Sequence, residues 1–357
     1  MSEWREVKLG EIINLYNGKA TKSNENGLYP VFGSNGIIGS VDDYAFEKGI
    51  IIGRVGAYCG SVKFSQKKFW ASDNTIVADV KEGKSLLFMK YMLSTLSINS
   101  YAVGSAQPLI TQGIIKNLKV SIPEISTQKK IATILSTYDK LIENNNRRIQ
   151  ILEQTAEELY KEWFVRMRFP GYEKTKFDKG IPEGWEVTKI GEMATFKRGK
   201  NLRIADAIEG DVPVIAGGIE PSCYHNESNT KAPVITVSAS GANAGYTRLN
   251  FIDVWASDCS YIDAEDSELI YYIYLLMKVS QKEILNLQLG SAQPHVYARD
   301  LNNFSFLKPP QNLIKEMNKQ AQIIFSEVKI LNIQNQNLIK QRDLLLPRLM
   351  NGTITIK

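Results

Sequence analysis

The chain of 357 residues contains two copies of one sequence plan, and this duplication limits its fold more than any other feature. Trp-Arg-Glu-Val-Lys-Leu-Gly-Glu-Ile starts at Trp4, and the related Trp-Glu-Val-Thr-Lys-Ile-Gly-Glu-Met starts at Trp185. Trp-Ala-Ser-Asp at 70–73 recurs at 255–258, and Gly-Ser-Ala-Gln-Pro at 104–108 recurs at 290–294. Because the matches keep their order and nearly their spacing, we expect two similar domains.

Each copy begins with strands and turns and continues into a long helix. Apolar runs bounded by glycine or proline, Gly49-Ile-Ile-Ile-Gly53 and Pro233-Val-Ile-Thr-Val237, predict short buried strands. One helix is expected in each copy, at about 86–96 and 269–279. Glycines and asparagines crowd the connections between these segments. The sequence therefore predicts an α+β fold with two similar domains, residues 1–125 and residues 184–310.

After each domain, apolar residues recur in alternating steps of four and three, the seam of a coiled coil. Asn145 and Asn335 interrupt the seams, and each either sets the helix register or marks a solvated position. The helices are expected at 126–168 and 311–350, joined through a Pro- and Gly-rich linker at 169–183. The seam positions are Ile131, Leu135, Tyr138, Ile142, Asn145, Ile149, Leu152, Ala156, Leu159 and Trp163, and then Met317, Ala321, Ile324, Val328, Leu331, Asn335, Leu338, Arg342, Leu345 and Leu349.

The two long helices are expected to pair with each other in antiparallel orientation, giving a pseudo-twofold molecule with a domain at either end. About 33 residues of helix make a rod of roughly 50 Å. Within the segment 311–350, Pro347 is expected to end the regular helix at or before Leu346. Apolar residues beside the seams widen the apolar stripe and predict further helices from another protein. The predicted subunit-interface residues are Ile134, Leu141, Ile149, Trp163, Ile330 and Ile339.

Composition excludes several classes of protein. Hydrophobic residues make up 43% and aromatic residues 10% of the chain, which is too many for a disordered protein. No apolar run is long enough to cross a bilayer and the N-terminal segment is charged, so we expect no membrane span and no secretory signal. Three cysteines and two histidines lie far apart, which argues against a disulfide scaffold or a zinc site. A cytoplasmic location is the expectation.

Motifs for catalysis do not emerge from the sequence. Gly18-Lys19 and Gly199-Lys200 are followed by Ala20 and Asn201, so neither is a nucleotide-binding loop that ends in Gly-Lys-Ser/Thr. The one Pro-Pro pair, in Lys308-Pro-Pro-Gln311, lacks the residues of an adenine-methylating site. A nuclease-like set of Asp73, Asp79 and Lys81 has no counterpart in the second copy. We therefore predict no catalytic, cofactor-binding or metal-binding residues.

Basic and aromatic residues near the glycine turns are candidates for DNA contact, although a solvated charged face is the commoner reason for such clusters. Residues 1–126 carry 14 basic and 11 acidic residues, a net charge of +3, whereas residues 184–310 carry 11 basic and 15 acidic residues, a net charge of −4. Only local clustering supports DNA binding in the second domain. Arg198 and Arg203 are the strongest single candidates. The full set is Arg54, Lys63, Lys67, Lys68, Lys197, Arg198, Lys200, Arg203, Arg248, Tyr297 and Arg299.

The Gly-Ser-Ala-Gln-Pro loops allow two interpretations. Gln107 and Gln293 could contact base edges, since glutamine makes paired hydrogen bonds with adenine. A structural turn is the alternative, and we favour it because two readers of different sequences should differ at their reading positions. Trp70 and Trp255 are predicted to anchor the core, with Asp73 and Asp258 holding a turn.

The order of domain, long helix, linker and repeat resembles the specificity subunit of type I restriction–modification enzymes, over essentially the whole chain. The most telling stretches are Ile122-Pro-Glu-Ile-Ser-Thr-Gln-Lys-Lys-Ile-Ala-Thr-Ile134 and Glu158-Leu-Tyr-Lys-Glu-Trp-Phe164, which continues to Arg168-Phe-Pro170. Ile181-Pro-Glu-Gly-Trp185 and Leu345-Leu-Pro-Arg-Leu-Met-Asn-Gly352 add to the resemblance.

This resemblance implies a non-catalytic reader of double-stranded DNA. Each domain, called a target-recognition domain in the family, would bind one half of a split, asymmetric site, with the paired helices as a spacer. Two modification subunits carrying S-adenosylmethionine would methylate adenine at N6, and restriction subunits would use ATP and Mg²⁺. A rod of roughly 50 Å spans about 15 base pairs. The rival interpretation is a two-domain scaffold that binds proteins and has no DNA role.

Overall fold

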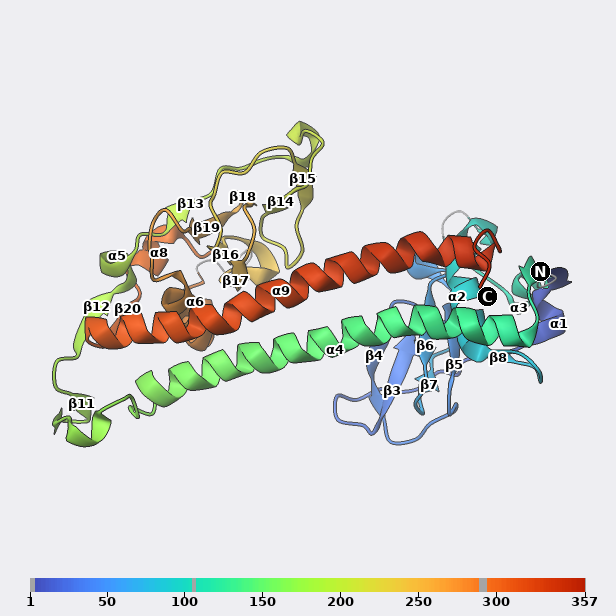
Figure 1. The fold of residues 1–357 in the computed structure, drawn as a ribbon, viewed down its shortest axis with the longest axis horizontal. Coiled ribbons are helices and arrows are strands. Elements are labelled where there is room, and N and C mark those ends of the chain that lie inside the picture. Colours follow the sequence, from blue (N-terminus) through green and yellow to red (C-terminus); the bar gives the residue numbers. More distant parts are fainter. Residues whose placement is uncertain (1–3, 105–106, 289–293, 357) are drawn as a thin grey trace. The chain divides into compact units, whose positions relative to one another are not determined.

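The computed structural model describes residues 4–104, 107–288 and 294–356. Contacts divide the chain into two units, Met1–Asn144 with Asn335–Lys357, called unit 1, and Asn145–Gln334, called unit 2. Each unit contains one strand-rich module and part of both long helices, α4 (Ile125–Phe164) and α9 (Gln311–Met350) (Figure 1).

The module of unit 1 is built on a sheet with the strand order β2-β8-β5-β6. The segments that connect these strands form a smaller sheet with the order β4-β3-β7. A strand pair, β1 with β9, brings the two ends of the module together. The strands are β1 (Arg5–Lys8), β2 (Ile13–Asn17), β3 (Tyr29–Gly33), β4 (Gly36–Val41), β5 (Gly49–Gly53), β6 (Val62–Ser65), β7 (Trp70–Ala71), β8 (Thr75–Val80) and β9 (Lys119–Ile122). The helices are α1 (Leu9–Ile12), α2 (Leu86–Thr95) and α3 (Gln112–Asn117), with 3₁₀ turns η1 (Gly56–Tyr58) and η2 (Ile98–Tyr101).

Unit 2 repeats these sheets strand for strand, as β13-β19-β16-β17, β15-β14-β18 and β12 with β20. Its strands are β12 (Glu186–Lys189), β13 (Lys197–Arg198), β14 (Val212–Ile215), β15 (Cys223–His225), β16 (Val234–Ser238), β17 (Thr247–Asn250), β18 (Trp255–Ala256), β19 (Cys259–Ile262) and β20 (Ser305–Lys308). The helices are α5 (Ile190–Met193), α6 (Ile270–Val279), α7 (Gln281–Leu285) and α8 (Ala298–Asn302), with η4 (Ile204–Asp206) and η5 (Gly241–Asn243). The expected strands and helices of both modules match β5, β16, α2 and α6 closely.

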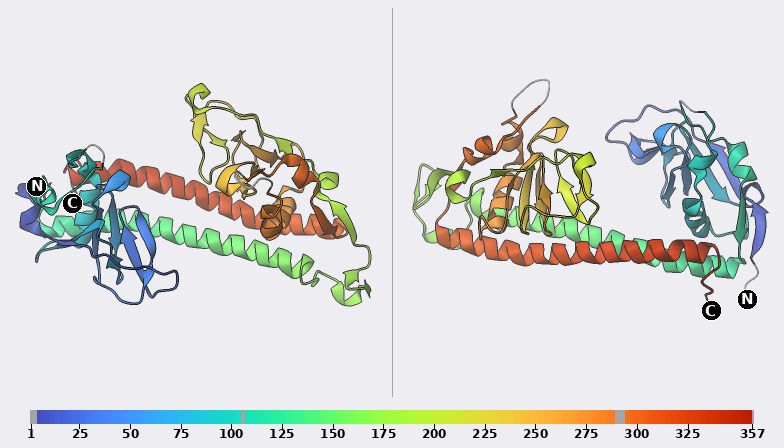
Figure 2. Two further views of the ribbon diagram at one scale, coloured as in Figure 1. Left: turned by 180° about the vertical axis from the view of Figure 1, so that it is seen from behind. Right: turned by 90° about the horizontal axis from the view of Figure 1, so that it is seen from above.

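Helices α4 and α9 lie side by side in antiparallel orientation within each unit (Figures 1 and 2). In unit 1, Arg342 forms an ion pair with Asp139 at 2.8 Å, and Leu349 shares a core with Ile131. In unit 2, Arg148 forms an ion pair with Glu327 at 2.8 Å. Residue numbers thus rise along one helix as they fall along the other. All twenty seam positions are buried or half-buried, including the two asparagines.

Helix α9 continues through Pro347 to Met350, so the expected end at or before Leu346 is wrong. Proline removes one backbone donor, but the helix needs only one more turn after it. That turn places Leu349 and Met350 in the core of unit 1, and Asn351 N still donates to Pro347 O at 3.0 Å. Burial of these two apolar side chains favours the extra turn.

The module helix of each unit packs against the long helices through a different joint. In unit 1, Asp139 of α4 accepts hydrogen bonds from Lys90 Nζ at 2.7 Å, Tyr91 OH at 2.7 Å and Arg342 Nη1 at 2.8 Å. In unit 2, the equivalent position in the repeat is Phe325, which stacks on Tyr271 at 5.8 Å between ring centroids. One joint is polar and charged, and the other is aromatic.

The segment expected as a linker holds more structure than its composition suggests. It contains the 3₁₀ turn η3 (Tyr172–Lys174) and the strand pair β10 (Phe177–Asp178) with β11 (Ile181–Pro182). Phe169 is buried against Trp185 at 5.3 Å between ring centroids. The return of the chain into the second module is therefore anchored in the core of unit 2.

Candidate nucleic-acid interface

A glycine–lysine turn and a tryptophan form the same structure in both units. In unit 1, Lys19 N donates to Ala71 O at 2.9 Å, and Trp70 Nε1 donates to Lys19 O at 2.8 Å. In unit 2, Lys200 N donates to Ala256 O at 2.9 Å, and Trp255 Nε1 donates to Lys200 O at 2.8 Å. The tryptophans therefore hold the turn as well as packing, and Trp255 is buried while Trp70 is half-buried.

Glycine is required in this turn because the backbones approach closely. A Cβ atom on Gly18 would lie 1.9 Å from Ser72 O, and one on Gly199 would lie 2.2 Å from Ser257 O. Both distances are far below van der Waals contact. The residue just before each glycine, Asn17 or Arg198, ends its strand with an exposed side chain.

A second shared element brings a distant segment beside this turn. In unit 1, Gly56 N donates to Pro108 O at 3.0 Å, and Ile110 N donates to Arg54 O at 2.9 Å. In unit 2, Gly241 N donates to Pro294 O at 3.1 Å, and Val296 N donates to Ala239 O at 3.0 Å. The segment that follows each Gly-Ser-Ala-Gln-Pro motif is thereby fixed next to the loop after β5 or β16. We call this turn, loop and segment the backbone frame of each unit.

In unit 2 the backbone frame surrounds an open pocket of about 580 Å³. His295 and Tyr297 stack with their rings 5.6 Å apart and nearly parallel, at 4°. The Arg299 guanidinium lies 5.5 Å from the Tyr297 ring centroid. Opposite charges are present too, since Asp258 lines the pocket and accepts a hydrogen bond from Ser240. The pocket is lined by Arg198, Ala239, Asp258, Ser260, His295, Tyr297, Ala298 and Arg299.

The other predicted residues of unit 2 lie around this pocket or away from it. Lys197 forms an ion pair with Asp266 at 2.5 Å, and this hydrogen bond raises the pKa of Lys197 above its usual value. Lys200 lies 5.7 Å from the Trp255 ring centroid. Arg203 pairs with Asp206 through Nε at 2.6 Å, and Arg248 lies on β17, at the edge of the sheet opposite to β13. Of the basic candidates in this unit, Arg198 and Arg299 line the pocket.

Unit 1 divides its predicted residues between two places. Arg54 belongs to the backbone frame, and Gln107 is exposed directly before Pro108 of the same frame. Lys63 lies on β6, and Lys67 and Lys68 follow that strand. The second predicted glutamine, Gln293, lies outside the described residues. Arg54 and the three lysines thus come from different elements of the module.

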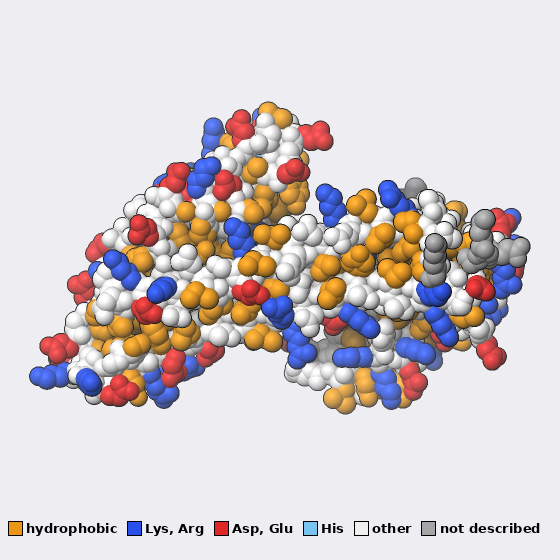
Figure 3. All heavy atoms as spheres, viewed as in Figure 1, with side chains coloured by type: hydrophobic (Ala, Val, Ile, Leu, Met, Phe, Trp, Pro, Cys, Tyr) orange, Lys and Arg blue, Asp and Glu red, His pale blue; other side chains and the backbone are white. Residues whose placement is uncertain are grey.

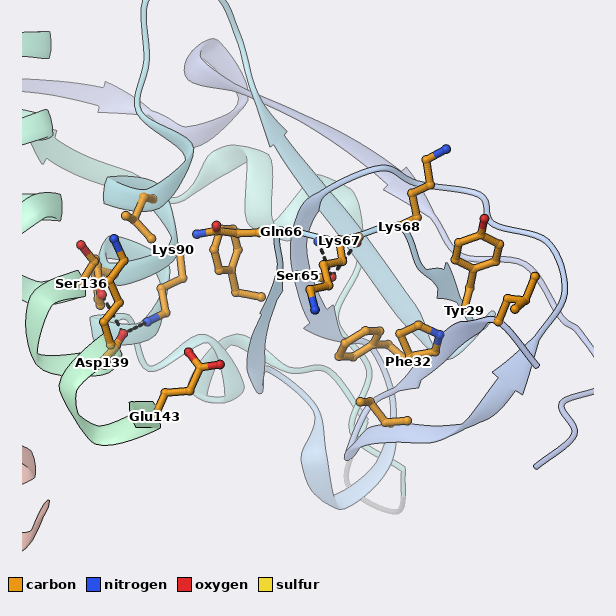
Figure 4. Close-up of a pocket in the computed structure, with 17 residues that line it drawn as sticks. Tyr29, Phe32, Ser65, Gln66, Lys67, Lys68, Lys90, Ser136, Asp139 and Glu143 are labelled. Carbon is orange, nitrogen blue, oxygen red and sulfur yellow. Dashed lines mark hydrogen bonds and ion pairs between the residues drawn. The ribbon is translucent and has the colours of Figure 1, made fainter. Parts of the chain in front are cut away.

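Lys67 and Lys68 line a separate open pocket of about 890 Å³ in unit 1 (Figure 4). Tyr29, Phe32 and the segment 65–68 form its sheet side, and Lys90, Ser136, Asp139 and Glu143 form its helical side. Lys68 Nζ lies 4.0 Å from the centroid of the Tyr44 ring. Lysines and carboxylates are mixed here, so the pocket has no single sign of charge.

Charges on the rest of the visible surface are mixed as well. On the face shown in Figure 3, Lys and Arg side chains are interspersed with Asp and Glu side chains over each unit. This agrees with the small net charges of both modules. Because the net charge of each module is small, we expect local contacts to matter most for holding an anion.

Comparison with known proteins gives the family. The model of the type I restriction modification DNA specificity domain matches residues 1–154 and 182–341. The chain belongs to this family. The resemblance inferred from the sequence is confirmed, and the chain is a specificity component and not a catalytic subunit.

Relatives of the specificity chain match over most of its length. The specificity subunit of the type I restriction enzyme MjaIX of Methanocaldococcus jannaschii is 27% identical over 351 residues, which cover 87% of this chain and 79% of the relative. The MjaVIII specificity subunit of the same organism is 23% identical, covering 99% and 94%. The crystal structure of a type I restriction–modification S subunit from M. genitalium has the same fold, with a TM-score of 0.66, 19% identity and coverage of 100% and 97%.

Predicted interface residues of the specificity chain lie on its long helices with different exposure. Ile134 packs against the core of unit 1, and Ile149 and Trp163 pack against the core of unit 2. Leu141, Ile330 and Ile339 are exposed by 47%, 49% and 39%. These three present apolar surface to solvent.

Sequence reasoning on the specificity chain missed His295 and the pair of Asn17 with Gln112, and it assigned Asp258 only to a turn. The signal lay in the repeat itself, because aligning the copies shows which positions near the shared motifs differ. Among the described residues no group of three His, Cys, Asp or Glu side chains could hold a metal ion. No helix in the described part of the chain is long and apolar enough to cross a membrane.

Proposed function

We propose that this specificity subunit reads a bipartite, asymmetric site on double-stranded DNA, one half with each module. The observation that carries the proposal concerns the backbone frame. Both units build this frame with the same backbone hydrogen bonds, yet they present different side chains from it. Equal frames with unequal side chains suit two readers of different sequences.

Local chemistry supports contact with DNA despite the net charge of the second module. Arg198, Tyr297 and Arg299 place two guanidinium groups and an aromatic face at one pocket. Guanidinium groups bind phosphate and guanine edges through paired hydrogen bonds. Because the module as a whole is acidic, we expect a shallow dependence of its affinity on salt, with few phosphate contacts.

The long helices are proposed to set the spacing between the two half-sites and to bind the partner subunits. Two modification subunits would supply S-adenosylmethionine and the adenine N6-methylation chemistry, and restriction subunits would supply ATP- and Mg²⁺-dependent activity. Leu141, Ile330 and Ile339 are exposed apolar residues on these helices and support a docking role.

Mapping of methylated adenines tests the proposal directly. The chain would be expressed with its cognate modification subunits in a host without adenine methylation of its own, and the host DNA would be sequenced for N6-methyladenine. We expect one split motif with two different halves, and no methylation when either component is expressed alone. Methylation by the chain alone, or a continuous motif, would contradict the proposal.

The scaffold interpretation predicts a different result. A protein-binding scaffold would assemble with partners but would leave DNA methylation without sequence preference, and DNA binding by the assembly would show the same affinity for all duplexes. Binding measured at several salt concentrations against cognate and scrambled duplexes separates the two functions.

A further inference from the structure

Equivalent positions of the backbone frame carry different side chains in the two units. The equivalence follows from the shared hydrogen bonds and from the repeated motifs, since Asn17 precedes Gly18-Lys19 just as Arg198 precedes Gly199-Lys200. After the Gly-Ser-Ala-Gln-Pro motif, the segments that lead into α3 and α8 also differ. The differing positions are Leu109, Thr111, Gln112 and Gly113 in unit 1, and, in the same order, His295, Tyr297, Ala298 and Arg299 in unit 2.

In unit 2 the frame presents an arginine that its surroundings leave available. Arg198 is exposed at the end of β13 and lines the pocket, and among the described residues it has no ion pair. The parallel rings of His295 and Tyr297 line the same pocket. A guanidinium fork matches the O6 and N7 acceptors of guanine, and it makes the commonest specific contact in the major groove.

In unit 1 the same place presents a pair of amides. Gln112 Nε2 donates to Asn17 Oδ1 at 2.9 Å, and this hydrogen bond is exposed. Within the described part of the chain, this hydrogen bond leaves the acceptor Gln112 Oε1 and both N–H groups of Asn17 Nδ2 for an outside partner. A donor beside an acceptor complements the N7 and N6 groups of adenine.

Other basic residues fit a reading role less well. Lys197 and Arg203 are each paired with an aspartate, at 2.5 Å and 2.6 Å. Arg248 lies at the opposite edge of the sheet. Lys67 and Lys68 line the other pocket of unit 1, where carboxylates are mixed with them.

We infer that Arg198 and the Asn17–Gln112 pair are the equivalent specificity-determining groups of the two modules: Arg198 contacts a guanine in one half-site, and the amide pair contacts an adenine in the other. This inference rests on the proposed function, since it names which residues of each module read bases. It explains how one frame, used twice, yields two different half-sites.

The test uses the complete chain with its cognate modification subunits and three matched variants. Arg198→Ala should relax the requirement for one guanine in one half-site, by roughly 5- to 150-fold in relative methylation rate, because a good paired contact discriminates by about 1–3 kcal/mol. Gln112→Ala should relax one adenine in the other half-site. Arg203→Ala is the control, since this arginine is equally cationic and close in sequence but paired with Asp206 outside the pocket. It should leave the motif unchanged.

The possible outcomes separate the inference from the proposed function. A wild-type complex with no split motif would reject the function itself. A wild-type split motif that Arg198→Ala leaves intact, with rates lowered equally at all sites, would show a phosphate contact and overturn the inference. Relaxation in both half-sites at once would also overturn it. If Arg198→Ala lowers the yield of the complex, Arg198→Gln keeps a polar chain of similar length and should shift the preference at that position from guanine toward adenine.

Discussion

At the scale of single residues, Asp139 shows how one carboxylate joins a module to the helix pair. Partial burial acts to raise the pKa of Asp139, but hydrogen bonds from Lys90, Tyr91 and Arg342 outweigh it and hold the pKa below its usual value. The three donors come from α2 and α9, so Asp139 connects three helices. Unit 2 fills the same position with Phe325 and aromatic partners, which need no charge.

Replacing Asp139 with asparagine should destabilise unit 1 at neutral pH. The change removes the charge that binds Lys90 and Arg342, and we expect a loss of about 1.5–3 kcal/mol, the range for hydrogen bonds to charged groups. Because the folded-state pKa is lowered, the stabilisation is present above the unfolded-state pKa of about 3.9 and is lost as the pH falls through the lower folded-state value. The melting difference between wild type and Asp139→Asn should therefore be full at pH 7 and shrink below about pH 4.

Asp343→Asn is the matched control for this prediction. Asp343 also bonds Arg342, at 2.9 Å, but its side chain is more exposed. Such surface pairs contribute about 0–1 kcal/mol, so its melting temperature should change little. Equal melting curves for wild type and Asp139→Asn at pH 7 would contradict the role given to this carboxylate.

Residue roles were predictable where the repeat preserved them. Both Trp-Ala-Ser-Asp motifs were expected to be structural, and each tryptophan does hold the glycine–lysine turn through its indole N–H. The pairing of Gln112 with Asn17 could not be foreseen, because these residues are 95 positions apart and the start of α3 meets the end of β2 only in the folded module. Arg203 was a leading candidate for DNA contact. Its ion pair with Asp206, which forms across the turn η4, makes this arginine a weaker candidate.

At the scale of elements, the spacing of apolar residues predicted the long helices because a periodicity of about 3.5 residues is a local property of the sequence. The end of α9 was missed because its last turn depends on tertiary contacts. Local preference disfavours a helix through Pro347, whereas the core of unit 1 buries Leu349 and Met350 beyond it. Packing outweighed a local rule by one turn.

Exposed apolar residues on α4 should matter for partner binding and not for folding. Leu141→Lys is expected to weaken binding of the modification subunit at least about tenfold, because it places a charge in an apolar contact. Its melting temperature should stay close to that of wild type, since Leu141 is 47% exposed. Size-exclusion chromatography with titrated modification subunit measures the first quantity, and thermal melting measures the second.

Ile151→Lys provides a comparison on the same helix. Ile151 is 52% exposed but lies about 80° around the helix from Leu141, on a face that was not predicted to bind a partner. Equal loss of binding in both variants would mean that general charge on α4, and not a defined apolar stripe, decides the association.

At the scale of the whole molecule, the duplication made the fold class predictable, since two copies of one plan must each build a similar core. The modules, however, do not build their cores alone. The core of unit 2 includes Tyr160 and Phe164 from α4 and Phe325 and Val328 from α9. Boundaries drawn from sequence at 184–310 therefore cut through contacts between the module and the long helices, which sequence composition cannot reveal.

Exchange of residues 184–310 for the matching segment of a related specificity subunit should change one half-site and leave the other unchanged. Each module carries its own backbone frame, so the exchanged segment should bring its own base contacts. The spacing between the half-sites should not change, because the helices set it. The incoming module must still pack on Tyr160, Phe164 and Phe325, and an exchange of 145–334, which moves these partners too, serves as the control for folding. Sequencing of N6-methyladenine reads the result. Two altered half-sites would show that the modules do not read independently, whereas one new half-site at the original spacing is the outcome that a repeated backbone frame requires.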